Sequence, residues 1–368
     1  MKFLHTADWQ IGMRATMLGD KAERVRMARL ESARRVIEFA RREAVDFVVV
    51  AGDTFEDNGV DRIKVREVAK ILGSAKCPVY VISGNHDPIM PGSVWEESIW
   101  RELPNIHLLT DQAPMKAPGT TLYPCPVSAK DSRDDPTAWI HPMDGSIAIG
   151  VAHGSVENPA YEQAAPVARQ AAEVHGLDYL ALGHFHSTAL YPGSDGATRM
   201  AYCGTHEPTA FGEQASGNVL LVEISHRGAP PHIQAVRTGI LEWLTYRRKI
   251  EEPGQIAALA TELDELSDPE RTMVHCALEG TLFGSDDDAL ARLLDIVEKR
   301  FLFGRSDTRY LVPDQNGPEW IERVDRFVFL PEPLDLVGCG HDSRIMATII
   351  KTADLGVAPP SDMPRQIH

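Results

Sequence analysis

The sequence has no long hydrophobic run, few cysteines and fewer basic than acidic residues. None of its apolar stretches approaches the roughly 20 residues that span a bilayer. Its first residues lack the basic start and long apolar segment of a signal peptide. The five cysteines are scattered, odd in number and never spaced as C-x-x-C, which disfavours a disulfide framework or a zinc knuckle. We therefore expect a cytoplasmic protein with reduced thiols and no membrane partner.

The formal net charge of −16 argues against a nucleic-acid binder that relies on a global positive field. The charge is uneven, however. Segment 21–42 carries eight Lys or Arg and three Glu, whereas segment 251–300 carries thirteen Asp or Glu and four Lys or Arg. Because charge runs on helices are usually solvated faces, the basic segment is first interpreted in that way.

Strand-like and helix-like patterns alternate in the first half of the chain. Strands are predicted at 1–7, 46–51, 78–83, 146–152 and 178–182, and helices at 21–43, 61–74, 93–102 and 161–175. Strands without long helices follow at 198–203, 217–225 and 232–238. Such alternation predicts an α/β architecture.

A length of 368 residues suggests two domains and a tail. The sheet pattern stops within 239–254, which ends at Pro253-Gly254. We therefore predict a first domain over 1–242, a small α+β domain over 243–335 and a loose or partner-docking tail over 336–368. In the small domain we predict helices at 255–267 and 286–301, and strands at 272–280 and 325–331.

Residues of metal-ligand type follow five of the predicted strands. They are Asp8 and Gln10, Asp53 with Glu56, Asn85-His86-Asp87, His153, and His184 with His186. In α/β sheets, ligands gather outside the carboxyl ends of the strands. Glycines beside several of these residues allow tight turns and close backbone approach.

Each motif is weak alone, because a lone Asp is often a helix cap and a lone His is often structural. We interpret five other histidines as structural: His5, His107, His141, His175 and His275. All five motifs in this order indicate a site. Carboxylates, amides and imidazoles without thiolate suit Mn²⁺, Fe or Mg²⁺. The set suffices for two ions that share a carboxylate and activate water against phosphorus, while a metal-free histidine protonates the leaving oxygen.

Together these motifs resemble the calcineurin-like metallophosphoesterase superfamily. The stretch "AYCGTHEPTAFGE" (201–213), followed by "GNVLLVEI" (217–224), also resembles the closing segment of SbcD-type DNA repair nucleases. The similarity extends over about residues 1–240, and more loosely over 243–335. It implies a four-layer αββα β-sandwich flanked by helices, followed by a small α+β DNA-capping domain.

The resemblance also implies the role of each site residue. Asp8, Gln10, Asp53 and His186 would bind one metal. Asp53, Asn85, His153 and His184 would bind the other, with Asp53 bridging. His86 would be the catalytic imidazole, oriented by Asp87. Two Mn²⁺ ions, 3′-to-5′ exonuclease and single-strand endonuclease activity on DNA, a homodimer and an SbcC-type coiled-coil ATPase partner are implied as well.

Two residues depart from the pattern of that family. Gln10 stands where the family usually has His. Its amide oxygen can bind metal directly, which favours Mn²⁺ or Mg²⁺ over Zn²⁺, or Gln10 acts through water or only forms a hydrogen bond. Glu56 stands where many relatives have His or Asp near the substrate phosphate. Its carboxylate repels phosphate unless it binds metal, holds a basic residue or points away.

Substrate contacts are predicted less directly, at Arg14, Phe185 and His206. Arg14 can reach a phosphate backbone together with Lys21, Arg24 and Arg26, or these are ordinary surface cations. Phe185 walls the pocket or belongs to the core, and His206 touches substrate or is structural. Two rival functions stay open: a small-molecule or nucleotide phosphodiesterase or phosphatase on the same metal core, and a catalytically silent scaffold.

Overall fold

The computed structural model describes residues 1–157 and 165–314. The first of its two large sheets has the strand order β14-β13-β1-β2-β3-β4. Its members are β1 (Lys2–Thr6), β2 (Phe47–Ala51), β3 (Val79–Ile82), β4 (Ile106–Leu108), β13 (Asn218–Glu223) and β14 (His232–Arg237). Strands β1 to β4 run parallel, and β13 pairs antiparallel with β1. The all-apolar sequence of β2, FVVVA, fits this central position because both of its faces are buried.

The second large sheet has the order β11-β12-β10-β7-β6-β5. Its members are β5 (Met115–Ala117), β6 (Thr120–Cys125), β7 (Ile147–His153), β10 (Tyr179–Gly183), β11 (Ala189–Pro192) and β12 (Thr198–Tyr202). The four central strands run parallel and both edge strands run antiparallel. A short pair, β8 (Ser155–Val156) with β9 (Pro166–Val167), follows β7.

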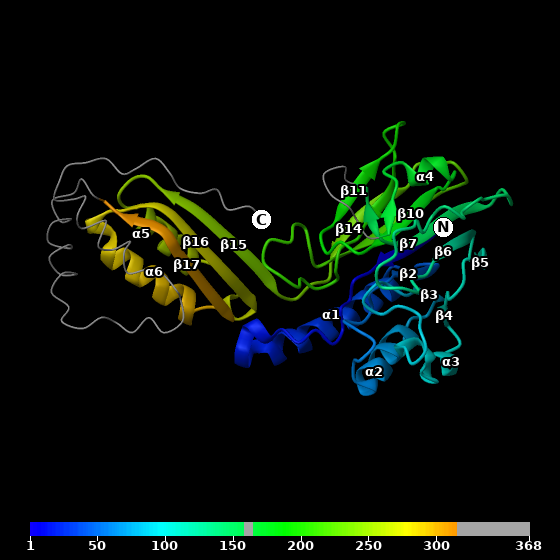
Figure 1. Cartoon of the computed structure of the whole chain (residues 1–368), viewed down its shortest axis with the longest axis horizontal. Coiled ribbons are helices and arrows are strands. Elements are labelled where there is room, and N and C mark those ends of the chain that lie inside the picture. Colours follow the sequence, from blue (N-terminus) through cyan, green and yellow to red (C-terminus); the bar gives the residue numbers. More distant parts are fainter. Residues whose placement is uncertain (158–164, 315–368) are drawn as a thin grey trace. The chain divides into compact units, whose positions relative to one another are not determined.

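The two sheets pack face to face and helices cover their outer faces (Figure 1). Alternate residues such as Phe47 and Val49 of β2 meet Val151 of β7 in a shared apolar core. On the outer face of the first sheet lie α1 (Ala22–Arg42), α2 (Arg62–Gly73) and the short α3 (Ile99–Glu102). The outer face of the second sheet is covered by α4 (Ala171–Val174) and neighbouring loops. The expected four-layer αββα arrangement is therefore confirmed.

A third sheet of three parallel strands follows in the sequence. It comprises β15 (Glu242–Ile250), β16 (Thr272–Leu282) and β17 (Phe303–Pro313) in that order. Helices α5 (Gln255–Asp264) and α6 (Asp287–Lys299) share an apolar core with one face of this sheet. Short 3₁₀ turns lie at Thr16–Lys21, Val94–Glu96, Pro269–Arg271 and Gly284–Asp286. Contacts group Met1–Pro313 into one compact unit, so the boundary at 242/243 stays a prediction.

Several predicted elements differ from those observed. Residues 165–175 form β9 and the four-residue α4 rather than one helix, and 93–102 holds only a 3₁₀ turn and α3. The segment 239–254 contains β15, where the alternation of "EWLTYRRKI" is masked by three consecutive cations. The sequence patterns do not predict strands β4, β5, β6, β11 and β17. The predicted strand 325–331 and the tail 336–368 lie outside the described residues. None of the helices in the described ranges is both long and apolar enough to cross a membrane.

Candidate metal centre

The carboxyl ends of five parallel strands from both large sheets bring the predicted metal ligands together. Asp8 and Gln10 follow β1, Asp53 follows β2, Asn85 follows β3, His153 ends β7, and His184 and His186 follow β10. Ligand atoms of Asp8, Asp53 and His153 lie within 4.8 Å of one another, and all three side chains are buried. We call Asn85, His153 and His184 the second half-site, and Asp8, Gln10 and His186 the first half-site, with Asp53 between them.

In the second half-site, one amide oxygen faces two imidazole nitrogens. Asn85 Oδ1 lies 2.9 Å from His153 Nε2 and 2.9 Å from His184 Nδ1. His153 Nδ1 donates a hydrogen bond of 2.9 Å to the Ala51 carbonyl, so the neutral ring has its lone pair on Nε2. That lone pair faces Asn85 Oδ1, and also Asp53 Oδ2 at 3.4 Å. A proton on His153 Nε2 can satisfy these oxygens, and a divalent cation bound among the three side chains would replace that proton.

In the first half-site, Gln10 supplies an unused oxygen. Its Nε2 donates to Asp53 Oδ2 over 3.0 Å, while its buried Oε1 has no hydrogen-bond partner among the described residues. Both carboxylate oxygens of Asp8 accept from the backbone N–H of His184, at 3.0 and 3.1 Å. A buried amide oxygen without a partner is costly, and a metal ion would satisfy it. This geometry suits direct metal binding by Gln10 Oε1. It is also compatible with binding through a water molecule, or with the hydrogen bond to Asp53 alone.

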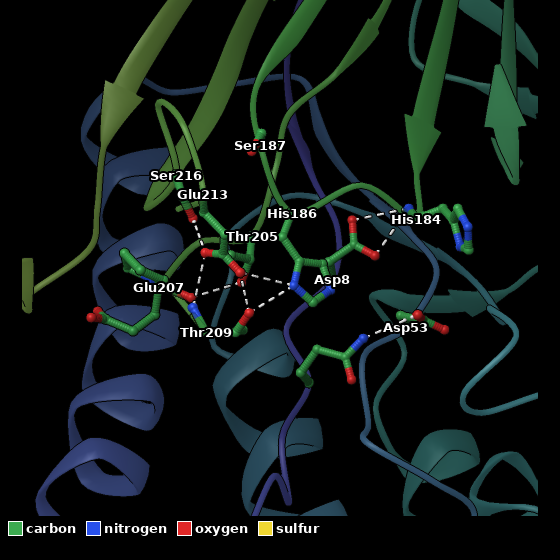
Figure 2. A network of polar contacts seen from close by, with 12 residues as sticks. Asp8, Asp53, His184, His186, Ser187, Thr205, Glu207, Thr209, Glu213 and Ser216 are labelled. Atoms are coloured by element: carbon green, nitrogen blue, oxygen red, sulfur yellow. Dashed lines mark hydrogen bonds and ion pairs between the residues drawn. The ribbon is translucent and has the colours of Figure 1, made fainter. Parts of the chain in front are cut away.

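His186 lies next to Asp8 and is the remaining side chain of the first half-site (Figure 2). Its Nδ1 lies 2.7 Å from Thr209 Oγ1 and 3.1 Å from Glu213 Oε1. A carboxylate only accepts hydrogen bonds, so Nδ1 carries the proton and Nε2 keeps its lone pair. This is the tautomer that a metal-binding histidine needs when its other nitrogen is hydrogen-bonded to a carboxylate.

The electrostatics of the centre follow from buried carboxylates and imidazoles packed together. Burial raises the pKa of Asp8 to about 7. Burial opposes protonation of His153, but Asp53 and Asp8 outweigh it and raise its pKa to about 9. Burial also opposes ionisation of Asp53, yet the neighbouring His153 and His86 hold its pKa down at about 2. For His184, burial and the neighbouring His153 lower the pKa to about 4, which keeps it in the neutral form that binds metal.

The backbone at the ligands is strained. Asp8, Gln10, Asp53 and His184 have φ angles of 53°, 46°, 49° and 117°, in the region that non-glycine residues rarely adopt. Each such conformation costs on the order of 1–3 kcal/mol and persists only where the surroundings impose it. Of the nine non-glycine residues with positive φ among those described, four are predicted ligands, so the strain is concentrated at this centre.

Glycines next to the ligands permit the close approach of the strands. A Cβ atom on Gly84 would overlap the Asp53 carboxylate. A Cβ atom on Gly183 would overlap the Ala51 carbonyl and lie 2.9 Å from His153 Nδ1. These two positions therefore need glycine because the ligands themselves occupy the space that a side chain would take.

His86 lies beside Asp53, but its orientation does not come from Asp87. The His86 ring donates through Nδ1 to the backbone carbonyl of Glu56 over 2.8 Å, and its backbone N–H donates to Asp53 Oδ1 over 2.8 Å. The Asp87 carboxylate instead accepts from the backbone N–H groups of Gly84, at 2.6 Å, and Phe55, at 2.9 Å. The prediction that Asp87 orients the His86 ring is therefore wrong, since one of its oxygens holds the turn after β3 at Gly84 and the other holds the backbone after β2 at Phe55.

The predicted substrate residues have different environments. Glu56 is half-buried, burial raises its pKa, and its carboxylate makes no hydrogen bond or ion pair within the described ranges. Phe185 is 37% exposed and packs edge-on against the rings of His184 and Tyr202, so it lies beside the second half-site. Arg14 is exposed. The cations predicted with it have protein partners: Lys21 with Asp20, Arg26 with Glu23, and Arg24 with the Glu270 carbonyl.

His206 is a correction to the sequence prediction. It is 0% exposed, its Nε2 is bonded to the Arg29 carbonyl over 2.9 Å, and its ring packs 5.0 Å from that of Trp9. A residue with no exposed surface cannot touch a substrate, so His206 is structural. His5 is also structural, as expected, with bonds to Tyr179 Oη and the Leu182 carbonyl.

The sequence analysis assigned no role to Glu213, Thr209 or Arg29, which surround the centre. Glu213 and Thr209 contact His186 from the loop between β12 and β13. Arg29 lies inside the basic helix but is only 1% exposed, and it donates to the carbonyls of Trp9, Glu207 and Pro208. Glu213 is the last residue of the 201–213 stretch that resembles the nuclease family. This resemblance is the one sequence signal that includes Glu213.

The structure has two hollows to consider, one beside the metal centre and one on the third sheet. A cavity of about 240 Å³ lies against the second half-site, where Asn85, His153 and His184 meet the loop that includes Lys130 and Asp134. A larger groove of about 990 Å³ lies on the face of the third sheet opposite α5 and α6. Its lining includes Arg247, Lys249, His275, Arg305 and Arg309.

Known proteins resemble this chain to different degrees. It is 25% identical over 229 residues to the uncharacterized metallophosphoesterase YhaO of Bacillus subtilis (strain 168), and the match covers 55% of each protein. The chain thus spans about half the length of this curated relative. TT1561 of Thermus thermophilus has a TM-score of 0.43 at 12% identity, covering 64% of this chain and 99% of that one. GAP50, the anchor in the inner membrane complex of Plasmodium, has a TM-score of 0.41 at 10% identity, covering 65% and 84%.

Structural likenesses at these scores carry no argument about substrate. The profile of the calcineurin-like phosphoesterase family, in contrast, matches residues 1–188. This range includes every predicted metal ligand, from Asp8 to His186, and makes up more than half of the 368 residues. The chain therefore belongs to the calcineurin-like phosphoesterase family.

Proposed function

We propose that this metal-dependent phosphoester hydrolase is a two-metal DNA phosphodiesterase, an SbcD-like nuclease subunit that uses Mn²⁺. The observation that carries the proposal is the convergence of seven ligand-type side chains from five strand ends, with ligand atoms of Asp8, Asp53 and His153 within 4.8 Å. The first half-site and Asp53 would hold one cation, and the second half-site and Asp53 the other. Nitrogen and oxygen donors without thiolate favour Mn²⁺ at both.

When bound, two divalent cations supply charge stabilisation for the phosphoryl oxygens and lower the pKa of water. The side chains of the protein supply the rest. His86 donates through Nδ1 to the Glu56 carbonyl, which leaves Nε2 free to face the substrate, and in its doubly protonated form the ring can pass the Nε2 proton to the leaving oxygen and become neutral. Phe185 presents an exposed ring beside the second half-site and can pack against the group attached to the phosphate.

DNA as the substrate is supported by the basic groove on the third sheet. Along β15, Arg247 and Lys249 point away from the core that Ile250 shares with α5, because alternate residues of a strand face opposite sides. His275 and Arg305 line the same groove. Five cations line the groove beside the acidic Glu279 and Asp307, and although Lys249 and Arg309 are paired with Glu251 and Asp307, the excess of cations suits the phosphate backbone of a nucleic acid.

The runner-up function is a small-molecule or nucleotide phosphodiesterase or phosphatase on the same centre. Two observations favour it. The cavity beside the second half-site, at about 240 Å³, is too small for a duplex and accommodates at most one small group. The carboxylate of Glu56 has no ion-pair partner within the described ranges, and it disfavours a nearby polyanion. A homodimer and an SbcC-type ATPase partner are proposed from the resemblance alone.

The deciding experiment offers both substrate classes to the Mn²⁺-loaded full chain. Labelled duplex DNA, single-stranded DNA and bis-p-nitrophenyl phosphate are compared, with Arg247→Ala/Arg305→Ala as the variant of the basic groove. We expect cleavage of all three by the wild type, and loss of DNA cleavage alone in the groove variant. Cleavage of only the chromogenic ester by the wild type would instead establish the runner-up.

A further inference from the structure

Glu213 has an unusually complete set of hydrogen-bond donors for a residue outside the predicted site. Its side chain is 11% exposed, and Figure 2 shows it beside Thr209, Ser216 and His186. Oε2 accepts from the backbone N–H of Thr209 at 3.0 Å and from Ser216 Oγ at 2.8 Å. Oε1 accepts from Thr209 Oγ1 and from His186 Nδ1. The carboxylate is therefore held rigidly and aimed at the imidazole.

This network fixes which nitrogen of His186 carries the proton. The single hydroxyl proton of Thr209 is donated to Glu213, so Thr209 Oγ1 is left to accept from His186 Nδ1. Both neighbours of Nδ1 are then acceptors, and only the tautomer protonated at Nδ1 satisfies them. The lone pair of His186 is consequently on Nε2, the nitrogen left for the first half-site.

The first half-site depends on His186 more than the second depends on either of its histidines. Its other side-chain ligands are the carboxylates of Asp8 and Asp53 and the amide of Gln10, so His186 is its one imidazole. In the second half-site, His153 is oriented by the backbone carbonyl of Ala51 instead, which no side-chain replacement removes. A side chain that orients the ligand imidazole is thus found at one half-site and a main-chain group at the other.

We propose that Glu213 is a positioning residue for the metal centre, which locks the tautomer and direction of His186 and so sets the Mn²⁺ affinity of the first half-site. The proposal rests on the two-metal centre proposed above, but not on its substrate. A carboxylate on the remote nitrogen of a ligand histidine raises its donor strength, and removing such a group typically weakens metal binding about 10–100-fold.

The test measures how many Mn²⁺ ions the full chain binds and with what affinity. Metal-free wild type and Glu213→Gln are titrated with Mn²⁺ alone, and free Mn²⁺ is followed by electron paramagnetic resonance. We expect two sites in the wild type, and in Glu213→Gln a loss of about 10–100-fold at one site with the other unchanged. The matched control is Glu207→Gln, a buried glutamate of the same loop that binds the backbone N–H groups of Ile240 and Leu241, not a histidine. It should keep both affinities.

A purely structural role predicts a different pattern. If Glu213 only stabilised its loop, Glu213→Gln and Glu207→Gln would weaken Mn²⁺ binding alike, which would overturn the proposal. Two unchanged sites in folded Glu213→Gln would overturn it as well, while leaving the DNA phosphodiesterase proposal intact. A wild type that bound no Mn²⁺ would reject both. Should Glu213→Gln fail to fold, the shorter Glu213→Asp withdraws the carboxylate from His186 Nδ1, and the same site-selective loss is expected.

Discussion

The two half-sites differ in how far the chain has already assembled them. In the second, Asn85 Oδ1 is 2.9 Å from a nitrogen of both His153 and His184, so its amide oxygen is already in contact with both imidazoles. In the first, the Gln10 amide is turned so that its Nε2 is bonded to Asp53, and its oxygen has no partner among the described residues. Pre-organised donors bind more tightly because less free energy is spent on arranging them. We therefore expect the second half-site to fill first.

Replacing Asp53, which both half-sites share, should have the largest effect. Asp53 lies between the half-sites, 3.0 Å from Gln10 Nε2 and 3.4 Å from His153 Nε2. Replacing it by Asn removes the charge that both cations share, so we expect Asp53→Asn to lose both tight Mn²⁺ sites and all measurable phosphodiester hydrolysis. Metal analysis after gel filtration checks this. Retention of one tight site would show that Asp53 serves a single half-site.

His86→Ala separates chemistry from metal binding. Because His86 touches Asp53 only through its backbone N–H, its side chain can be removed without taking a ligand. Cleavage of labelled DNA, whose leaving alkoxide needs a proton, should fall by about 10²–10⁴-fold, the usual contribution of a general acid, while both Mn²⁺ sites persist. Equal turnover in variant and wild type would rule out His86 as the proton donor. A wild type with both ions bound but no turnover on any ester would favour the silent scaffold.

Gln10→His should reduce the difference between the half-sites. An imidazole at position 10 is a stronger and softer donor than an amide oxygen, so the first half-site should bind Mn²⁺ about tenfold or more tightly and gain affinity for Zn²⁺. Competition between Mn²⁺ and Zn²⁺ in the titration measures both effects. Unchanged affinities would mean that Gln10 is not a direct ligand.

The smallest effect concerns buried histidines that have no carboxylate beside them. Burial lowers the pKa of His206 to about 3, against 6.5 in the unfolded chain. Between these values the unfolded state binds more protons, so the free energy of unfolding falls as pH drops below about 6.5, by about 1.4 kcal/mol per pH unit per such histidine. Urea unfolding of the metal-free protein at pH 7 and pH 5 should show a smaller fall in His206→Phe. The exposed His226→Gln should match the wild type, and a His206→Phe fall equal to that of the wild type would refute the assignment.

The sequence predicts which side chains gather at the strand ends because their positions follow from topology. Parallel strands end at one edge of a sheet, so residues that follow β1, β2, β3, β7 and β10 are bound to meet once the two sheets pack face to face. The alternation of apolar strands and amphipathic helices predicts the α/β architecture, whereas the four-layer arrangement was expected from the family resemblance.

The remaining features depend on contacts that no local pattern encodes. Glu213 reaches His186 across 27 positions through a loop whose path the sequence does not specify. The strand β15 was hidden because Arg248, between Arg247 and Lys249, stands on the helix-facing side where alternation would place an apolar residue, and it pairs there with Glu262 of α5. Asp87 next to His86 suggested a hydrogen-bonded carboxylate–imidazole pair. In the structure, both carboxylate oxygens of Asp87 instead accept from backbone N–H groups, those of Gly84 and Phe55.

The loop from β12 to β13 has a consequence beyond orienting one ring. Glu207 in this loop grips the backbone at Ile240 and Leu241, immediately before β15, while Thr209 and Glu213 a few positions later hold His186. A displacement of the three-stranded sheet would therefore be transmitted through residues 207–213 to His186, the one imidazole of the first half-site.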